Sequence, residues 1–157
     1  MHIICIGKLK EAYLASAAAE YIKRIRGYTE LNIHELPEER LPAKPSPAEI
    51  TKALEAEGGR IYARLPRPPH HITALVSCGR QMSTQEFSCF VQRKFVESKT
   101  PVFIIGSSHG LAASIIQRAD TSLSLSPMTF PHQIARILIL EQLYRSLNII
   151  NGGKYHK

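Results

Sequence analysis

Residue types that could bind a ligand or move a proton are concentrated in the second half of the chain. Residues 106–110 read Gly-Ser-Ser-His-Gly, and residues 126–132 read Ser-Pro-Met-Thr-Phe-Pro-His. The two prolines of the second loop favour an extended backbone, whose N–H and C=O groups stay free to pair with a planar group such as adenine. Leu125, Met128 and Phe130 could enclose that ring, although Met128 and Phe130 could equally be core residues. The pattern indicates a ligand site at this loop.

The glycine-bounded loop is open to two interpretations. Gly106 could be needed for the backbone dihedral angles of a tight strand-to-helix turn, or it could let the backbone approach a ligand closely. His109 and His132 could likewise be ordinary loop histidines or ligand contacts. A hydrolase would need Ser107 or Ser108 beside a histidine base. The loop lacks the G-x-S-x-G spacing and no acidic partner is evident, so the pattern does not favour that class.

A cation and a polar tail complete the set of candidate residues. Arg136 falls in the first turn of the expected last helix, where a cation opposes the helix dipole, so it indicates either a functional use or an acidic neighbour. Pro131 is suited to open that helix, and its free N–H groups could receive a carboxylate. Residues 151–157 could be a frayed terminus. Alternatively, Tyr155 and His156 offer stacking, hydrogen bonding and a proton acceptor near neutral pH.

Several familiar sites are missing from the sequence. Neither a G-x-x-x-x-G-K-[ST] loop nor a G-x-G-x-x-G after the first strand is present. Cys5, Cys78 and Cys89 are scattered and contain no C-x-x-C pair, which indicates reduced thiols in a cytoplasm and neither a disulfide framework nor a zinc site. His70 and His71 have no partner at metal-ligand spacing, so we expect no metal and place both on the surface.

Composition limits the class of protein. The 157 residues fit a single domain, 1–157, with 44% hydrophobic and 21% charged residues. A net charge of +7 and a pI near 9.5 indicate a polyanionic partner or, equally, a solvated basic surface. No apolar run approaches the roughly 18 residues of a membrane-spanning helix, and the N-terminal charges follow the apolar run, the wrong order for a signal peptide. We therefore expect a cytoplasmic protein without a membrane segment.

Short apolar strands alternate with amphipathic helices along the whole chain. We expect strands at 2–6, 31–36, 72–76 and from 102, and helices at 10–25, 47–57, from 84, at 111–119 and from about 131. Ser46 with Glu49, and Ser83 with Glu86, form capping boxes, while Gly58-Gly59 should end or kink the second helix. The alternation predicts an α/β fold with a mostly parallel sheet flanked by helices. Both candidate loops would then open on the edge where the strands end, the usual ligand edge of such sheets.

Several segments together resemble one family. These are G-S-S-H-G-L, S-L-S-L-S-P-M-T-F-P-H-Q-I-A-R, L-E-Q-L-Y-R and the terminal K-Y-H-K, supported by M-H-I-I-C-I-G-K-L-K and A-L-V-S-C-G. The chain resembles, over essentially its whole length, the RlmH family. These are small SPOUT-class (α/β-knot) methyltransferases that methylate N3 of a pseudouridine in bacterial 23S rRNA, with S-adenosylmethionine as cofactor.

The resemblance implies a C-terminal trefoil knot, a homodimer and a particular set of site residues. The positions implied to bind S-adenosylmethionine are Leu75, Gly106, Leu125, Ser126, Pro127, Met128, Thr129 and Phe130. The acceptor site is implied to lie near the partner's tail, here Tyr155, His156 and Lys157. His156 could act as the base, and Arg136 or Lys157 could stabilise an anion or hold phosphate. No metal is implied.

This sequence departs from the family pattern at three places. Ser107 replaces the second glycine of the loop, Val76 stands where relatives often have an acid, and Lys154 stands where some have proline. A side chain at position 107 could crowd the cofactor or add a hydrogen bond to it. The alternative function is a basic ribosome-binding knot protein without catalytic turnover.

Overall fold

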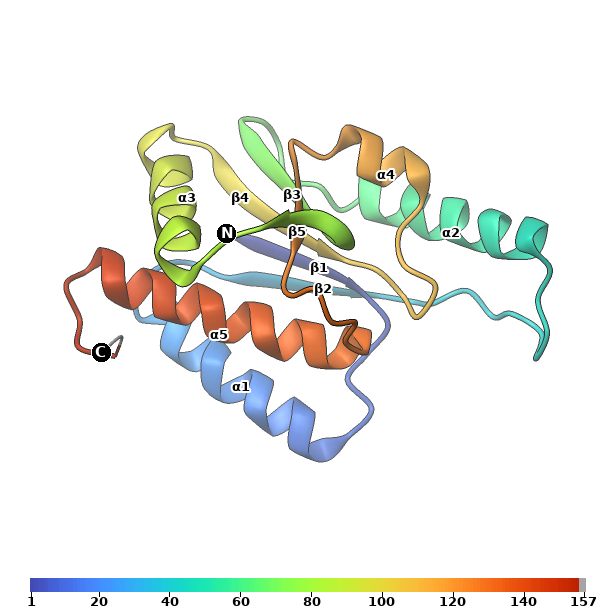
Figure 1. The fold of residues 1–157 in the computed structure, drawn as a ribbon, viewed down its shortest axis with the longest axis horizontal. Helices are drawn as coiled ribbons and strands as arrows, with labels where there is room; N and C mark the ends of the chain where they lie inside the picture. Colours follow the sequence, from blue (N-terminus) through green and yellow to red (C-terminus); the bar gives the residue numbers. More distant parts are fainter. Residues whose placement is uncertain (156–157) are drawn as a thin grey trace.

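A computed structural model describes residues 1–155 as an alternation of strands and helices (Figure 1). The elements are β1 (His2–Ile6), α1 (Ala12–Arg26), β2 (Asn32–Leu36), α2 (Pro47–Tyr62), β3 (His70–Gln81), α3 (Thr84–Val96), β4 (Thr100–Ile105), α4 (Ala113–Arg118), β5 (Thr121–Ser124) and α5 (His132–Ile150). The expected strands and helices form in the expected order, and β5 is an additional strand between the last two helices.

The strands form one five-stranded sheet in the order β2-β1-β4-β3-β5, and every neighbouring pair is parallel. Ile3 of β1, for example, pairs with Ile33 of β2 on one side and with Phe103 of β4 on the other. The predicted α/β fold with a parallel sheet is confirmed. All strand carboxyl ends consequently meet at one edge, which carries the loops after β1, β2, β4 and β5.

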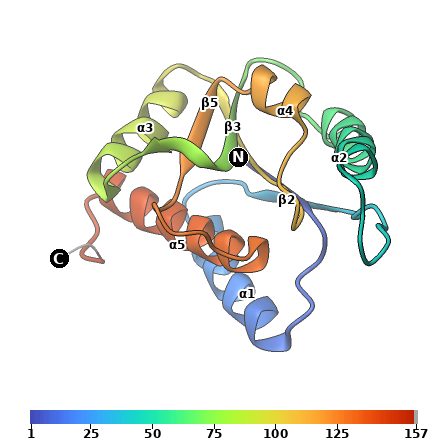
Figure 2. The same cartoon turned by 45° about the vertical axis from the view of Figure 1, so that its right-hand side comes forward.

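Alternation along the central strands produces two hydrophobic cores. Ile3 and Cys5 face a core shared with α1, α3 and α5, whereas Ile4 and Ile6 face a core shared with α2 and α4. Figures 1 and 2 show the corresponding layers, with α1 and α5 side by side below the sheet and α2 beside α4. Because both faces are covered, the strands read as continuous apolar runs.

Helix α2 differs from the prediction at its end. Both capping boxes form as expected, at Ser46 and at Ser83, but α2 continues through Gly58-Gly59 to Tyr62. A Cβ at Gly58 would lie 3.3 Å from the Cβ of Ala112, so the missing side chain lets α2 approach the start of α4 closely. Helix packing here overrides the low helix propensity of glycine.

Strand β3 is longer than predicted and curls around β5. Leu123 of β5 pairs with Leu75 in the first half of β3 and again with Arg80 in the second half. A Cβ at Gly79 would lie 2.6 Å from the carbonyl carbon of Leu123, so only glycine permits this crossing. The second half of β3 is mostly exposed, so its residues after Val76 are largely polar and lack the apolar run that predicts a buried strand. The C-terminal trefoil knot stays a prediction.

Two further predictions about burial were wrong. The spacing of apolar residues in the helix at 10–25 predicts one inner stripe of Tyr13, Leu14, Ala17, Tyr21, Ile22 and Ile25, but Tyr13 is exposed, and Leu14, Ala18 and Ile25 form the buried face. His71 was expected on the surface but is buried, because its position in β3 points its ring into the helical layer, where it packs edge-on against Phe90. Within residues 1–155, no helix has the length and hydrophobicity needed to cross a membrane.

Candidate functional site

A cavity of about 380 Å³ opens at the carboxyl end of β5, between the start of α3 and the middle of α5. Its lining residues are Met82, Ser83, Thr84, Phe87, Leu123, Ser124, Leu125, Ser126, Phe130, Leu138, Ile139 and Gln142. The walls are thus mainly apolar, with hydroxyl groups and one side-chain amide among them. Such a combination is typical of a small-molecule site, where apolar contacts supply affinity and a few polar groups fix orientation.

The predicted cofactor loop contributes three residues to this cavity. Leu125, Ser126 and Phe130 line it, and Phe130 is 36% exposed. Met128 is 72% exposed and lies outside the lining. Neither Phe130 nor Met128 is therefore a core residue. The hydroxyl of Ser126 accepts a hydrogen bond from Met128 N at 3.0 Å, which turns the loop outward after the strand. Pro127 and Thr129 are exposed on this turn.

Gly106 and Leu75 lie beside the cavity region without lining it. The backbone N–H groups of Ser107 and Gly110 each donate to the other residue's carbonyl, at 3.1 and 3.0 Å. This tight turn would bring a Cβ at Gly106 into collision with the Gly110 carbonyl oxygen, so the turn alone requires glycine there. Leu75 pairs with Ile105 and with Leu123, which places it between the strands that carry the two loops.

The side chain of Ser107 is held by a buried carboxyl group. Ser107 Oγ donates to Glu57 Oε2 at 3.0 Å, and Glu57 Oε1 accepts from Glu39 N at 2.9 Å. Glu57 is only 3% exposed, and this burial raises the pKa of its carboxyl group above the ordinary value. Ser107 is therefore directed into α2, where it does not enter the cavity. Sequence reasoning missed Glu57, because a glutamate in an amphipathic helix gives no signal of burial.

Arg136 has the acidic neighbour that its unfavourable place in α5 suggested. It is 6% exposed, and its Nη1 lies 2.7 Å from Glu35 Oε1 at the end of β2. Cys5 lies nearby in β1 and lines the same small cavity as Arg136. Burial raises the pKa of the Cys5 thiol to about 12 although Arg136 opposes the shift, so this thiol is neutral and unreactive.

The tail folds back on the C-terminal half of α5. Tyr155 N donates to Asn148 Oδ1 at 3.0 Å, and the Tyr155 ring packs edge-on against Tyr144 with centroids 4.8 Å apart. Arg145 lies over the same ring at 4.6 Å. Burial, together with neighbouring Tyr21 and Glu141, raises the pKa of the Tyr155 hydroxyl. His156 and Lys157 lie outside the described residues.

Arg136 and Tyr155, the predicted catalytic residues within the described part of the chain, are not brought together in one chain. Arg136 lies near the start of α5, whereas Tyr155 packs on Tyr144 in the C-terminal half of the helix. Eight residues of helix at a rise of about 1.5 Å each separate the two contact points by roughly 12 Å. A site that uses both would have to combine two chains or rearrange the tail.

Comparison with known proteins decides the family. The profile described as "Predicted SPOUT methyltransferase" matches residues 1–156. The chain belongs to the SPOUT methyltransferase family. Proteins named ribosomal RNA large subunit methyltransferase H are 42% identical in Carboxydothermus hydrogenoformans and 44% identical in Bacillus cereus, each over 156 residues that cover 99% of this chain and 98% of the relative. The resemblance to the RlmH family is confirmed.

The fold of this SPOUT methyltransferase is also found among solved structures. A crystal structure of a "probable methyltransferase" from Bordetella pertussis superposes with a TM-score of 0.55 at 19% identity, covering 93% of each chain. At that identity the likeness shows a shared fold.

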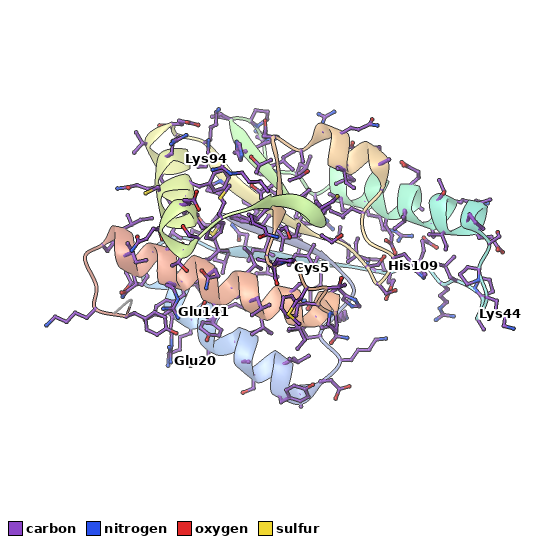
Figure 3. The ribbon with its side chains drawn as sticks, viewed as in Figure 1. Cys5, Glu20, Lys44, Lys94, His109 and Glu141 are labelled. Atoms are coloured by element: carbon purple, nitrogen blue, oxygen red, sulfur yellow. The ribbon has the colours of Figure 1, made fainter. Side chains whose placement is uncertain are left out.

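The two loop histidines of this SPOUT methyltransferase, His109 and His132, lie at the same sheet edge. His109 is exposed in the glycine loop and is labelled at the tip of that loop in Figure 3. His132 begins α5, with its Nε2 3.9 Å from the position of a Cβ at Gly7. No group of three or more His, Cys, Asp or Glu side chains in residues 1–155 is arranged to hold a metal ion. Thr84 and Gln142, which line the large cavity, carried no recognisable sequence signal.

Proposed function

We propose that this SPOUT methyltransferase methylates N3 of a pseudouridine in large-subunit (23S) ribosomal RNA, with S-adenosylmethionine as the methyl donor. The observation that carries the proposal is full-length similarity to proteins named ribosomal RNA large subunit methyltransferase H, at 42% identity over 99% of this chain. Similarity of that extent leaves almost none of the relative unmatched, because 98% of it is covered as well.

The cavity at the end of β5 fits the proposed cofactor. Its volume of about 380 Å³ is in the range of sites that enclose a drug-sized molecule. Phe130 and Leu125 offer apolar contact to a flat ring, while Ser126 and the backbone of the same loop offer polar groups. Gly106, Leu75, Pro127, Met128 and Thr129 would bound the same region from the neighbouring loops. When bound, S-adenosylmethionine supplies an electrophilic methyl group on a sulfonium.

The acceptor nitrogen must lose its proton before it becomes a strong nucleophile. The cation of Arg136 could stabilise the resulting anion, and His156 is the proposed base. Tyr155 is suited to donate a hydrogen bond, because a phenol is protonated near neutral pH and the pKa of this hydroxyl is raised further. Methyl transfer needs no metal. Proximity and orientation would supply the rest of the rate enhancement.

We propose that the enzyme is a homodimer in which each acceptor site takes the tail of the partner. Helix α5 supports this arrangement, because apolar side chains on it remain partly exposed in the single chain, among them Ile137, Leu138 and Tyr144. The distance between Arg136 and Tyr155 along α5 supports it too. The proposed knot is supported by the crossing of β3 over β5 at Gly79. The continuous sheet and the match over residues 1–156 support a single domain, 1–157.

The proposed partner is consistent with the charge of the chain. A net charge of +7 favours binding to the phosphate backbone of ribosomal RNA through release of counterions. A ribosomal substrate would place the enzyme in the cytoplasm. The alternative is a ribosome-binding knot protein without turnover. It would be favoured if the Ser107 side chain crowded the cofactor, but that side chain is hydrogen-bonded to Glu57 and leaves the cavity open.

A gene deletion tests the proposed function in the source organism. Mass spectrometry of 23S rRNA digests should show one pseudouridine that loses a methyl group in the deletion strain and regains it when the gene is restored. Thermal denaturation with S-adenosylmethionine tests the cofactor separately, because a ligand that binds only the folded state raises the melting temperature. Binding without any missing methyl group would favour the alternative function.

A further inference from the structure

A second, very small cavity lies at the carboxyl end of β1, beneath the first turn of α5. Its volume is about 10 Å³, and its lining includes Gly7, Lys8, His132, Gln133 and Arg136. A space of this size accepts about one water-sized group. Ile105, which immediately precedes the glycine loop, also lines it, so the cavity lies between the two loops proposed to hold the cofactor.

Arg136 presents an unused hydrogen-bond donor in this region. Its Nη1 is paired with Glu35 at 2.7 Å, but its Nε is buried and has no hydrogen-bond partner among residues 1–155. A buried cationic N–H group without a partner costs free energy, and a cation in the first turn of a helix is also opposed by the dipole. Arg136 is therefore a poor choice for stability alone, and its Nε indicates that an acceptor atom belongs there.

The first turn of α5 adds to this preference for an acceptor. Pro131 precedes the helix, no side chain caps it, and its first turn contains no acidic residue. The side chain of Gln133 is already engaged, since its Oε1 accepts a hydrogen bond from Lys10 N at 3.1 Å. His132, Gln133 and Arg136 line the same small cavity, so the free N–H groups of this turn and the Arg136 Nε lie close to it.

Size and charge restrict what the acceptor atom can be. The cavity admits a single oxygen atom but no complete phosphate group. Glu35 balances the charge of Arg136, so a doubly charged ligand would meet no excess positive charge from this pair. A carbonyl oxygen that gains partial negative charge fits both limits. N3 of a pyrimidine is flanked by two such oxygens, which share the charge when N3 loses its proton.

We propose that the Arg136 cavity receives one carbonyl oxygen of the acceptor pyrimidine, that Arg136 Nε donates a hydrogen bond to it, and that Glu35 is the positioning residue for Arg136. This inference rests on the proposed function and specifies where its acceptor base lies. The hydrogen bond stabilises the pyrimidine after N3 has lost its proton, which lowers the pH at which N3 can react. Arg136 contributes only this hydrogen bond, and the N3 proton passes to the catalytic base or to solvent.

Single-turnover methylation of purified large subunits between pH 6 and pH 10 tests the proposal. Arg136→Lys keeps the charge beside Glu35 but removes the Nε donor. We expect a rate about 100-fold lower than wild type at neutral pH, the usual effect of losing one preorganised donor, with unchanged affinity for S-adenosylmethionine. The deficit should shrink as the pH rises, because hydroxide then deprotonates N3 without help. Glu35→Gln should give the same pH dependence with a smaller deficit.

The control is Arg93→Lys, which alters an exposed arginine in the last turn of α3 and should leave the rate unchanged. An equal deficit at every pH would show a merely structural role for Arg136 and overturn the proposal.

Crystals with S-adenosylhomocysteine and pseudouridine 5′-monophosphate give a second, independent readout. A base carbonyl in the cavity supports the proposal, whereas a phosphate oxygen or a water there overturns it. A wild-type enzyme without methylation activity would instead refute the proposed function.

Discussion

Ser107 and Glu57 are joined by a 3.0 Å hydrogen bond that ties the glycine loop after β4 to the middle of α2. The second oxygen of the same carboxyl group accepts from Glu39 N at 2.9 Å, in the loop after β2. One buried side chain thus connects two loops at the edge of the sheet where ligands of parallel α/β folds bind. The serine that departs from the family pattern is accommodated by this contact and does not obstruct the cavity.

Glu57 should make the folded protein less stable as the pH rises. Its carboxyl group has a pKa raised above the ordinary 4.5 by burial, so the unfolded chain releases this proton at a lower pH than the folded protein does. Stability associated with the protonated form is therefore present below pH 4.5 and is lost as the pH rises through the folded pKa. Glu57→Gln keeps a carbonyl acceptor for Ser107 and removes the titration.

Urea denaturation of wild type and Glu57→Gln between pH 4 and pH 8 measures this effect. The stability of the wild type relative to the variant should fall across that range. A constant difference would mean that the folded and unfolded states share one pKa for Glu57, which would contradict a pKa raised by burial.

Phe130→Ala should weaken binding of S-adenosylmethionine and leave the fold intact. The ring lines the large cavity and is 36% exposed, so its loss removes a ligand contact more than a core contact. We expect about tenfold weaker binding by calorimetry, consistent with the loss of roughly 1.4 kcal/mol of aromatic contact. Phe95→Ala is the matched control, since that ring is 37% exposed on α3 outside the cavity. Equal affinities for both variants would remove Phe130 from the site.

Gly79→Ala should prevent correct docking of β5 against β3. The added Cβ would lie 2.6 Å from the Leu123 carbonyl carbon and 2.7 Å from its amide nitrogen, and both are backbone atoms that cannot move aside. We expect loss of several kcal/mol of stability or no folded protein. Gly59→Ala is the control, because its Cβ meets nothing within 4 Å in α2 and should stabilise the helix by about 0.5–1 kcal/mol. Similar melting temperatures for both variants would contradict the crossing.

Deletion of residues 155–157 should abolish methylation and preserve cofactor binding, if the tail completes the partner's acceptor site. Mixed dimers give the sharper test. Neither Arg136→Lys nor the truncated chain should be active alone, but an equal mixture contains heterodimers with one intact composite site. We expect about a quarter of wild-type activity to return after the subunits exchange. No recovery would show that both residues serve the same chain.

The sequence predicted the order of elements well, because the apolar runs of β1 and β4 and the two serine capping boxes are local signals. It could not predict features that depend on distant contacts. Gly58 lies inside α2 only because α4 packs against it, and β3 extends past Val76 only because it crosses β5 at Gly79. The same limit applied to the site. Leu125, Ser126 and Phe130 could be found from the loop they share, whereas Thr84, Gln142 and Glu57 come from helices that reach the sheet edge through the fold.

Methyl transfer by the purified protein tests the central claim most directly. Large ribosomal subunits from the deletion strain are incubated with the enzyme and isotopically labelled S-adenosylmethionine, and the rRNA is digested for tandem mass spectrometry. The account predicts one labelled methyl group per subunit, on N3 of a single pseudouridine of 23S rRNA, and none with the tail-deleted chain. Label on another base, or no label although the cofactor binds, would contradict it.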